Sequence, residues 1–104
     1  MSVQDRIKNI VNKIVSTAKP EKVILFGSHA WGKPSKDSDV DLFVIQQSNE
    51  RRLEREIKLY NAIFPAGIAV DVLAYTPEEV DRRLKLGDFF IKKILTRGEV
   101  LYAK

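Results

Sequence analysis

Short apolar runs that alternate with helical patterns set the strongest limit on how this chain can fold. Three runs of five or six residues, at 22–26, 40–45 and 69–74, are rich in β-branched and aromatic residues, as buried strands are. The segments between them carry apolar residues at helical spacing, and a run at 100–102 can add a short strand. This order predicts an α/β (α+β) fold with a small mixed sheet and helices packed mainly on one face.

Two longer helices are expected in the first two thirds of the chain, besides a short one after the first strand. The first has an apolar stripe between residues 3 and 15, can be capped by Ser2, and should end before Pro20. The second can be capped by Ser48 and should run through Phe64. Its inner face is expected to carry the apolar residues at helical spacing, which are Leu53, Ile57, Tyr60 and Phe64.

The last third is expected to hold two more helices. Thr76 can cap the first of them, and Glu79 three residues later completes a capping box. Gly87 separates it from a helix that runs to about Arg97. Both helices are crowded with apolar residues, most of which we assign to the core, although a surplus could form an interface.

Composition narrows the class of protein. A chain of 104 residues with 44% hydrophobic residues suits one domain, here residues 1–104. There is no cysteine, which excludes disulfides and thiolate metal sites. No apolar run approaches a membrane span, and charges near the N-terminus argue against a signal peptide, so we expect a cytoplasmic protein.

Basic residues give a net charge of +4 and gather late in the chain, at Arg82, Arg83, Lys85, Lys92, Lys93 and Arg97. A solvated helix face is the simpler interpretation of this group. The alternative is a surface for phosphates or an acidic partner. RNA binding is less favoured, because aromatic residues are not interleaved with the basic ones.

Gly27-Ser28 follows the first strand directly and should lead into a short helix. Glycine lets the backbone approach a ligand closely, and a helix N-terminus offers free N–H groups that suit phosphate. The Ser28 hydroxyl can add another donor. A simple turn is the alternative for such a pair.

Two aspartates, Asp39 and Asp41, lie at the start of the second strand. Side chains alternate between faces along a strand, so both carboxylates should point the same way while Val40 and Leu42 point toward the core. Adjacent carboxylates repel, and a divalent cation such as Mg²⁺ relieves the conflict with hard oxygen ligands. The alternative is an acidic loop end that caps nearby N–H groups.

Asp71 lies within the third apolar strand, where a carboxylate is costly unless it is paired or metal-bound. If this strand lies beside the strand of Asp39 and Asp41, three carboxylates converge. The alternative is an edge-strand aspartate that faces water.

Together these residues resemble the nucleotidyltransferase signature of the DNA polymerase beta superfamily: Gly27-Ser28, ten intervening residues, Asp39-x-Asp41, then a strand with Asp71. The segments LFGSHAWG and SDVDLFV are most similar to the minimal nucleotidyltransferase (MNT) family. The resemblance covers residues 22–73 and implies a nucleotidyltransferase fold.

The resemblance also implies roles for these residues. Gly27 and Ser28 would hold the β- and γ-phosphates of a nucleoside triphosphate such as ATP. Asp39 and Asp41 would bind two Mg²⁺ ions. Asp71 would bind the catalytic ion and help to activate the attacking hydroxyl, either as a base or by orienting it. An acceptor hydroxyl would then receive a nucleoside monophosphate, AMP when ATP is the donor.

The family often has arginines after Gly-Ser, whereas this chain has His29 and Trp31. Lys33 or Lys36 could replace the missing cation, His29 could contact a phosphate or be structural, and packing is the favoured role for Trp31. MNT proteins are often antitoxins that adenylylate a helical HEPN toxin, so the resemblance implies a HEPN-type protein partner. A noncatalytic antitoxin that occludes its partner, or nucleotide addition to RNA, are the alternatives.

Overall fold

The computed structural model describes residues 2–35 and 37–104, which form five helices and four strands in the expected order. The helices are α1 (Val3–Ala18), α2 (Ser28–Trp31), α3 (Arg52–Ile63), α4 (Pro77–Lys85) and α5 (Phe89–Arg97). The strands are β1 (Lys22–Phe26), β2 (Val40–Ile45), β3 (Val70–Tyr75) and β4 (Glu99–Ala103). Strands β1 and β2 have the expected bounds, and β3 is displaced by one residue.

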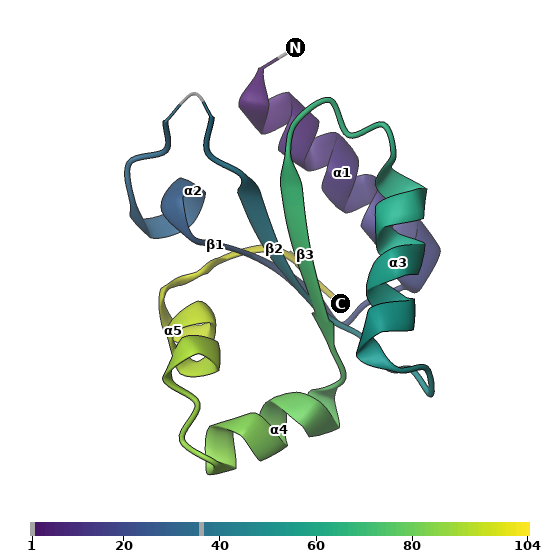
Figure 1. The fold of residues 1–104 in the computed structure, drawn as a ribbon, viewed down its shortest axis with the longest axis vertical. Coiled ribbons are helices and arrows are strands. Elements are labelled where there is room, and N and C mark those ends of the chain that lie inside the picture. Colours follow the sequence, from purple (N-terminus) through teal and green to yellow (C-terminus); the bar gives the residue numbers. More distant parts are fainter. Residues whose placement is uncertain (1, 36) are drawn as a thin grey trace.

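The four strands form one mixed sheet in the order β3-β2-β1-β4 (Figure 1). Strand β1 lies antiparallel to both β2 and β4, whereas β2 and β3 are parallel. Parallel neighbours need a crossover connection, and α3 lies within it. The small mixed sheet of the expected fold class is therefore confirmed.

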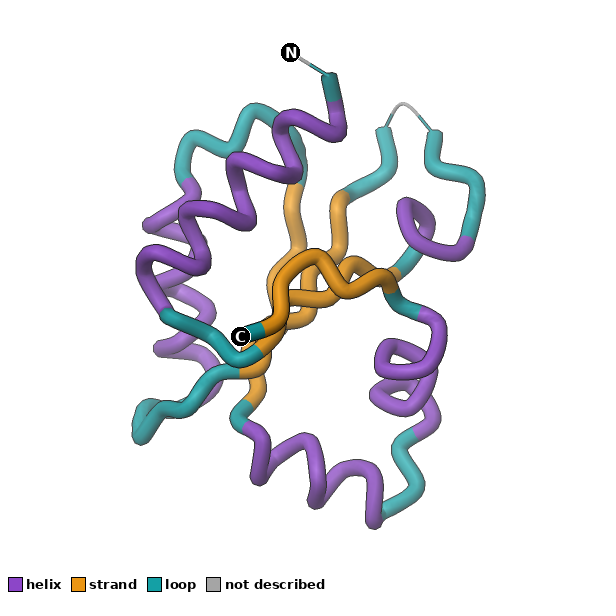
Figure 2. The backbone as a smooth tube through the Cα atoms, turned by 180° about the vertical axis from the view of Figure 1, so that it is seen from behind, coloured by secondary structure: helices purple, strands orange, loops and turns teal. Residues whose placement is uncertain are grey.

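Helices cover both faces of the sheet, so the expectation that they pack mainly on one face is wrong. Figures 1 and 2 show α1 and α3 on one side of the strands and α2, α4 and α5 on the other. One core joins α1 and α3 to the sheet, and a second joins α4 and α5 to the opposite face. Both faces need cover because consecutive strand residues point to opposite faces of the sheet. Leu42 and Phe43, for example, are both buried.

Predicted helix ends are mostly confirmed. The Ser2 hydroxyl accepts a hydrogen bond from Asp5 N–H at 3.1 Å, and α1 ends before Pro20. Thr76 and Glu79 form the complete capping box of α4. Ser48 does not cap α3, since its hydroxyl accepts from Glu50 N–H in the preceding turn and the helix begins four residues later.

The predicted inner face of α3 is wrong. Leu53 and Phe64 have exposed fractions of 68% and 79%, and Ile57 and Tyr60 are exposed as well. The buried residues of α3 are Arg55, Leu59 and Ile63. Arg55 tolerates burial because its Nη2 donates to both carboxylate oxygens of Glu79, at 2.9 and 3.0 Å. A charged residue thus occupies the inner face, and an apolar stripe of Leu53, Ile57 and Phe64 faces outward.

Two side chains of α3 hold the edge of β3. The hydroxyl of Tyr60 accepts a hydrogen bond from Val72 N–H at 2.8 Å, and Glu56 Oε2 accepts one from Ala74 N–H at 2.9 Å. Unpaired N–H groups on an edge strand invite pairing with another chain. Here Tyr60 and Glu56, one helical turn apart, satisfy two of them.

In the last third, Val80, Ile91 and Ile94 are buried as expected, while Leu86 and Phe89 are exposed. Among residues 2–35 and 37–104, none of the helices combines the length and the apolar character needed to cross a lipid bilayer.

Candidate functional site

The three aspartates predicted to converge are neighbours on the sheet. Parallel pairing of β2 with β3 places Asp41 directly opposite Asp71, and Asp39 lies two residues before Asp41. A hydrogen bond of 2.9 Å from Val40 N–H to Ala69 O ties the beginnings of these strands together. Because Val40, Leu42 and Val72 are buried in the core shared with α1 and α3, the aspartates face the opposite side.

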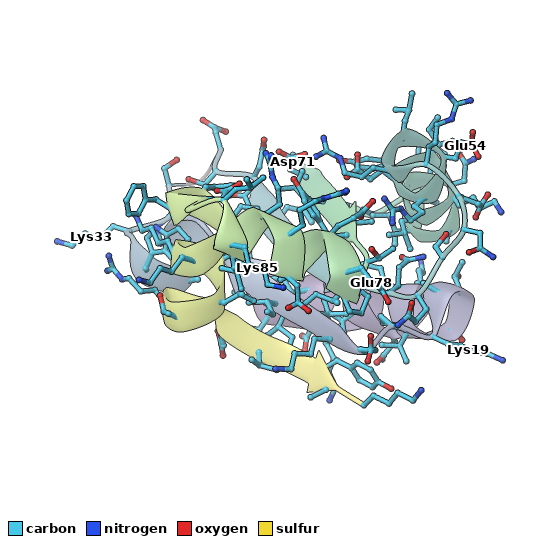
Figure 3. All side chains as sticks on the ribbon, turned by 90° about the horizontal axis from the view of Figure 1, so that it is seen from below. Lys19, Lys33, Glu54, Asp71, Glu78 and Lys85 are labelled. Carbon is cyan, nitrogen blue, oxygen red and sulfur yellow. The ribbon has the colours of Figure 1, made fainter. Side chains whose placement is uncertain are left out.

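The aspartates lie toward the β3 side of the sheet. Figure 3 shows Asp71 on the side of the molecule opposite β4. Asp39 and Asp71 are exposed and Asp41 is half-buried, so solutes can reach all three carboxylates.

The turn at Gly27 lies against Asp41. Residue Phe26 at the end of β1 is paired with Asp41, and Gly27 follows with φ of 76°. A Cβ atom at Gly27 would collide with Oδ2 of Asp41. Only glycine therefore combines this backbone conformation with the close approach. Ser28 begins α2, and the first N–H groups of a helix have no acceptor within it, so the turn can present donors beside the carboxylate.

Repulsion between the aspartates shows in the pKa of Asp41. Burial raises this pKa above its usual 3.8, and the negative charges of Asp71 and then Asp39 raise it further. The nearby His29 acts in the opposite direction. Burial and the charges of Asp71 and Asp39 thus disfavour the ionised form of Asp41, a conflict that a divalent cation would relieve.

The carboxylates fit a divalent cation chemically, although they are not gathered around one point. Within the described residues, no three His, Cys, Asp or Glu side chains are close enough together to hold a metal ion. Asp39 and Asp71 are exposed, so both side chains have room to rotate. Three carboxylates on adjoining strands supply the hard oxygen ligands that Mg²⁺ prefers.

His29 and Trp31, which stand where the family often has arginines, both make contacts within the fold. His29 Nε2 lies 3.3 Å from Ser38 O and so links α2 to the loop before β2. Trp31 packs against Phe26, with ring centroids 6.3 Å apart, which confirms the packing role. Lys33 is exposed in the loop, and Lys36 lies outside the described residues.

Two features near the site were missed by sequence reasoning. The Tyr60 hydroxyl donates to Asp71 Oδ1 at 3.1 Å, although Tyr60 had been assigned to the core. Lys93 and Arg97 of α5 stack on Trp31, with Lys93 Nζ 4.6 Å from the ring centroid. The sequence pattern held no signal for the Tyr60 contact, and the cluster of late basic residues was the only signal for the contacts with Trp31.

Comparisons with known proteins agree with this geometry. The family model "Polymerase beta, Nucleotidyltransferase" matches residues 8–104. A protein of Methanocaldococcus jannaschii named "Putative protein adenylyltransferase MJ0604" is 26% identical over 105 residues, spanning 98% of this chain and all of the relative.

Solved structures share the fold. A "putative nucleotidyltransferase from Sulfolobus solfataricus" superposes with a TM-score of 0.67 at 20% identity, covering 96% of this chain and 79% of that one. A toxin–antitoxin structure with AMP-PNP gives 0.57 at 22% identity, covering 93% and 73%. The MntA–HepT toxin–antitoxin structure gives 0.55 at 20% identity, covering 97% and 73%. With a family model that matches nearly the whole chain, this protein belongs to the polymerase beta nucleotidyltransferase family.

Proposed function

We propose that this chain is a single nucleotidyltransferase domain that transfers a nucleoside monophosphate, AMP from ATP, to a hydroxyl group of a partner protein. The main support for this function is that Asp41 lies opposite Asp71 on two parallel strands, with the Gly27 turn against Asp41. The carboxylates and the Gly27 turn are thereby held side by side where β1 ends and β2 and β3 begin. This is the arrangement that in-line attack on a phosphorus atom requires.

In this proposal each residue has a defined task. Gly27 and Ser28 hold the β- and γ-phosphates through backbone N–H groups and the serine hydroxyl. Asp39 and Asp41 hold two Mg²⁺ ions, and Asp71 binds one of them and orients the acceptor hydroxyl. The bound ions would stabilise the charge on the entering and leaving oxygens.

The transfer exchanges one bond for another. The acceptor oxygen forms a bond to the α-phosphorus while the bond from that phosphorus to the bridging oxygen breaks. Pyrophosphate leaves, and the hydroxyl proton passes to the carboxylate of Asp71 and then to solvent.

A protein acceptor is supported by the name of the M. jannaschii relative, which is almost the same length as this chain. The toxin–antitoxin structures of the same fold support a toxin as the partner, and we propose a HEPN-type toxin with this chain as its antitoxin. The outward apolar stripe of α3 also offers surface to a partner, because such patches are common at interfaces.

The test uses this chain copurified with a HEPN-type protein as the candidate toxin, Mg²⁺ and ATP radiolabelled at the α-phosphorus. Wild type should label the toxin, and Asp41→Asn should abolish labelling while folding normally. Asp81→Asn is the matched control, since Asp81 is an exposed aspartate on α4. Labelling by Asp41→Asn at the wild-type rate would refute the proposal.

A second candidate is a noncatalytic antitoxin that neutralises its partner by occlusion. The replacement of the family's arginines by His29 and Trp31, and the exposed stripe of α3, favour it. Neutralisation that survives joint loss of Asp39 and Asp41 would select this candidate. Nucleotide addition to RNA would instead require RNA binding that falls steeply with salt.

A further inference from the structure

The hydroxyl of Tyr60 makes two hydrogen bonds, as acceptor in one and as donor in the other. Its oxygen accepts from Val72 N–H at 2.8 Å, and the hydroxyl lies 3.1 Å from Oδ1 of Asp71. A backbone N–H can only donate, so the single phenol proton is free to point at the carboxylate.

The position of Tyr60 is set by rigid surroundings. Its neighbour Leu59 and the later Ile63 are almost fully buried in the core beneath α3. Val72, whose N–H binds the phenol, is buried in the same core. The hydroxyl therefore sits between a packed helix and a packed strand, while Asp71 itself is exposed and can rotate about its own bonds.

We propose that Tyr60 is a positioning residue for Asp71. Its hydroxyl holds Oδ1 and leaves Oδ2 free for the divalent cation and the acceptor hydroxyl. Side chains that hydrogen-bond to metal-ligating carboxylates typically change metal affinity or activity by about 10–100-fold when they are removed. The inference rests on the proposed function for the role of Asp71, but the contact with Tyr60 does not depend on it.

The alternative is that Tyr60 only supports the edge of β3. Glu56, which binds the same edge, provides a control for that role. Glu56 Oε2 accepts from Ala74 N–H, two residues along the same edge, and lies 3.3 Å from Arg52 Nε. No hydrogen bond or ion pair of the described residues joins Glu56 to Asp39, Asp41 or Asp71. Tyr60→Phe and Glu56→Ala each remove the acceptor of one edge N–H. Only Tyr60→Phe also releases Asp71.

The experiment measures two quantities on wild type, Tyr60→Phe and Glu56→Ala. The first is Mn²⁺ affinity of the chain with a nonhydrolysable ATP analogue, which needs no transfer. The second is the rate of label transfer to the copurified partner at varied ATP. For Tyr60→Phe we expect Mn²⁺ affinity at least about 10-fold weaker and kcat about 10–100-fold lower, with KM for ATP changed less than about 3-fold. Glu56→Ala should match wild type in both.

Three results would overturn the inference. Tyr60→Phe could bind Mn²⁺ and transfer like wild type, or Glu56→Ala could show equal losses, which would mean that edge support is the whole effect. Mass spectrometry could also find the label on Tyr60, which would make it an acceptor. If no variant transfers label, the proposed function fails, while the Mn²⁺ affinities still decide the role of Tyr60.

Discussion

At the scale of single residues, electrostatic repulsion is concentrated at Asp41. Burial raises its pKa, and the charges of Asp71 and Asp39 raise it further. Gly27 has no side chain, and one placed there would collide with Asp41 Oδ2. An arrangement that costs stability persists when the site needs it for binding. Substitutions at Asp41 and Gly27 should therefore separate stability from function.

Asp41→Asn should stabilise the fold while abolishing transfer. A carboxyl whose pKa is raised by folding costs stability at pH values above that pKa, and the cost disappears below its ordinary pKa of 3.8. With metal removed by chelator, we expect the variant to gain up to about 1 kcal/mol near neutral pH, because water screens this half-exposed group. Urea unfolding at neutral and acid pH measures this. An equal gain at both would contradict the electrostatic explanation.

Gly27→Ala should lose both stability and transfer. The alanine must keep a positive φ, and its Cβ must displace the carboxylate of Asp41. We expect the free energy of unfolding to fall by about 1–3 kcal/mol. Gly87→Ala is the matched control, because Gly87 has φ of 80° and nothing lies within 4 Å of a Cβ built there. The control should lose about 1 kcal/mol and keep full transfer. Equal loss of transfer in both variants would argue against a role for Gly27 in the site.

At the scale of elements, α3 combines structural and functional contacts. Its buried face carries Arg55, Leu59 and Ile63, and its edge-facing side chains Glu56 and Tyr60 hold β3. This orientation could not be predicted from the sequence. Apolar residues at helical spacing fit a stripe through Leu53 and Ile57 equally well, and the partner that makes Arg55 burial acceptable lies 24 residues away.

The orientation of α3 predicts a contrast between its two apolar stripes. Leu53→Ser and Phe64→Ser should change the free energy of unfolding by less than about 0.5 kcal/mol, because both side chains are mostly exposed. Leu59→Ala should cost about 2–5 kcal/mol, since Leu59 is 1% exposed. Urea denaturation of the three variants measures the contrast. A large loss for Leu53→Ser would mean that the helix is turned the other way.

The pair of Arg55 and Glu79 predicts an acid sensitivity. Burial alone would raise the pKa of Glu79, but hydrogen bonds from Arg55 and from Thr76 N–H outweigh it and lower the pKa below the usual 4.5. The stabilisation from the ionised Glu79 is thus complete above pH 4.5. It is lost as the pH falls through the lower pKa that Glu79 has in the folded protein.

Glu79→Ala should therefore cost about 3 kcal/mol near neutral pH, because it leaves the buried Arg55 guanidinium unpaired. The loss should shrink in acid, where the wild-type carboxylate is itself protonated. Unfolding titrations at several pH values check this, and a loss that is independent of pH would contradict it.

At the scale of the whole molecule, the sequence predicted the features that depend on local residue patterns. The order of all nine elements, the bounds of β1 and β2, and the shared face of Asp39 and Asp41 follow from strand periodicity and cap residues. The convergence with Asp71 depended on β3 lying beside β2, which the family resemblance implied. What the sequence could not show were contacts between side chains of different elements, such as Tyr60 with Asp71 and Trp31 with Lys93.

We propose that the adjoining ends of β1, β2 and β3 form one site for divalent ions and a nucleoside triphosphate. Anomalous scattering from a crystal grown with Mn²⁺ and a nonhydrolysable ATP analogue tests it most directly. We predict manganese between Asp39, Asp41 and Asp71, with the analogue's β- and γ-phosphates on Gly27 and Ser28. Manganese bound elsewhere on the chain, or phosphates distant from Gly27 and Ser28 in a fully occupied complex, would contradict the account.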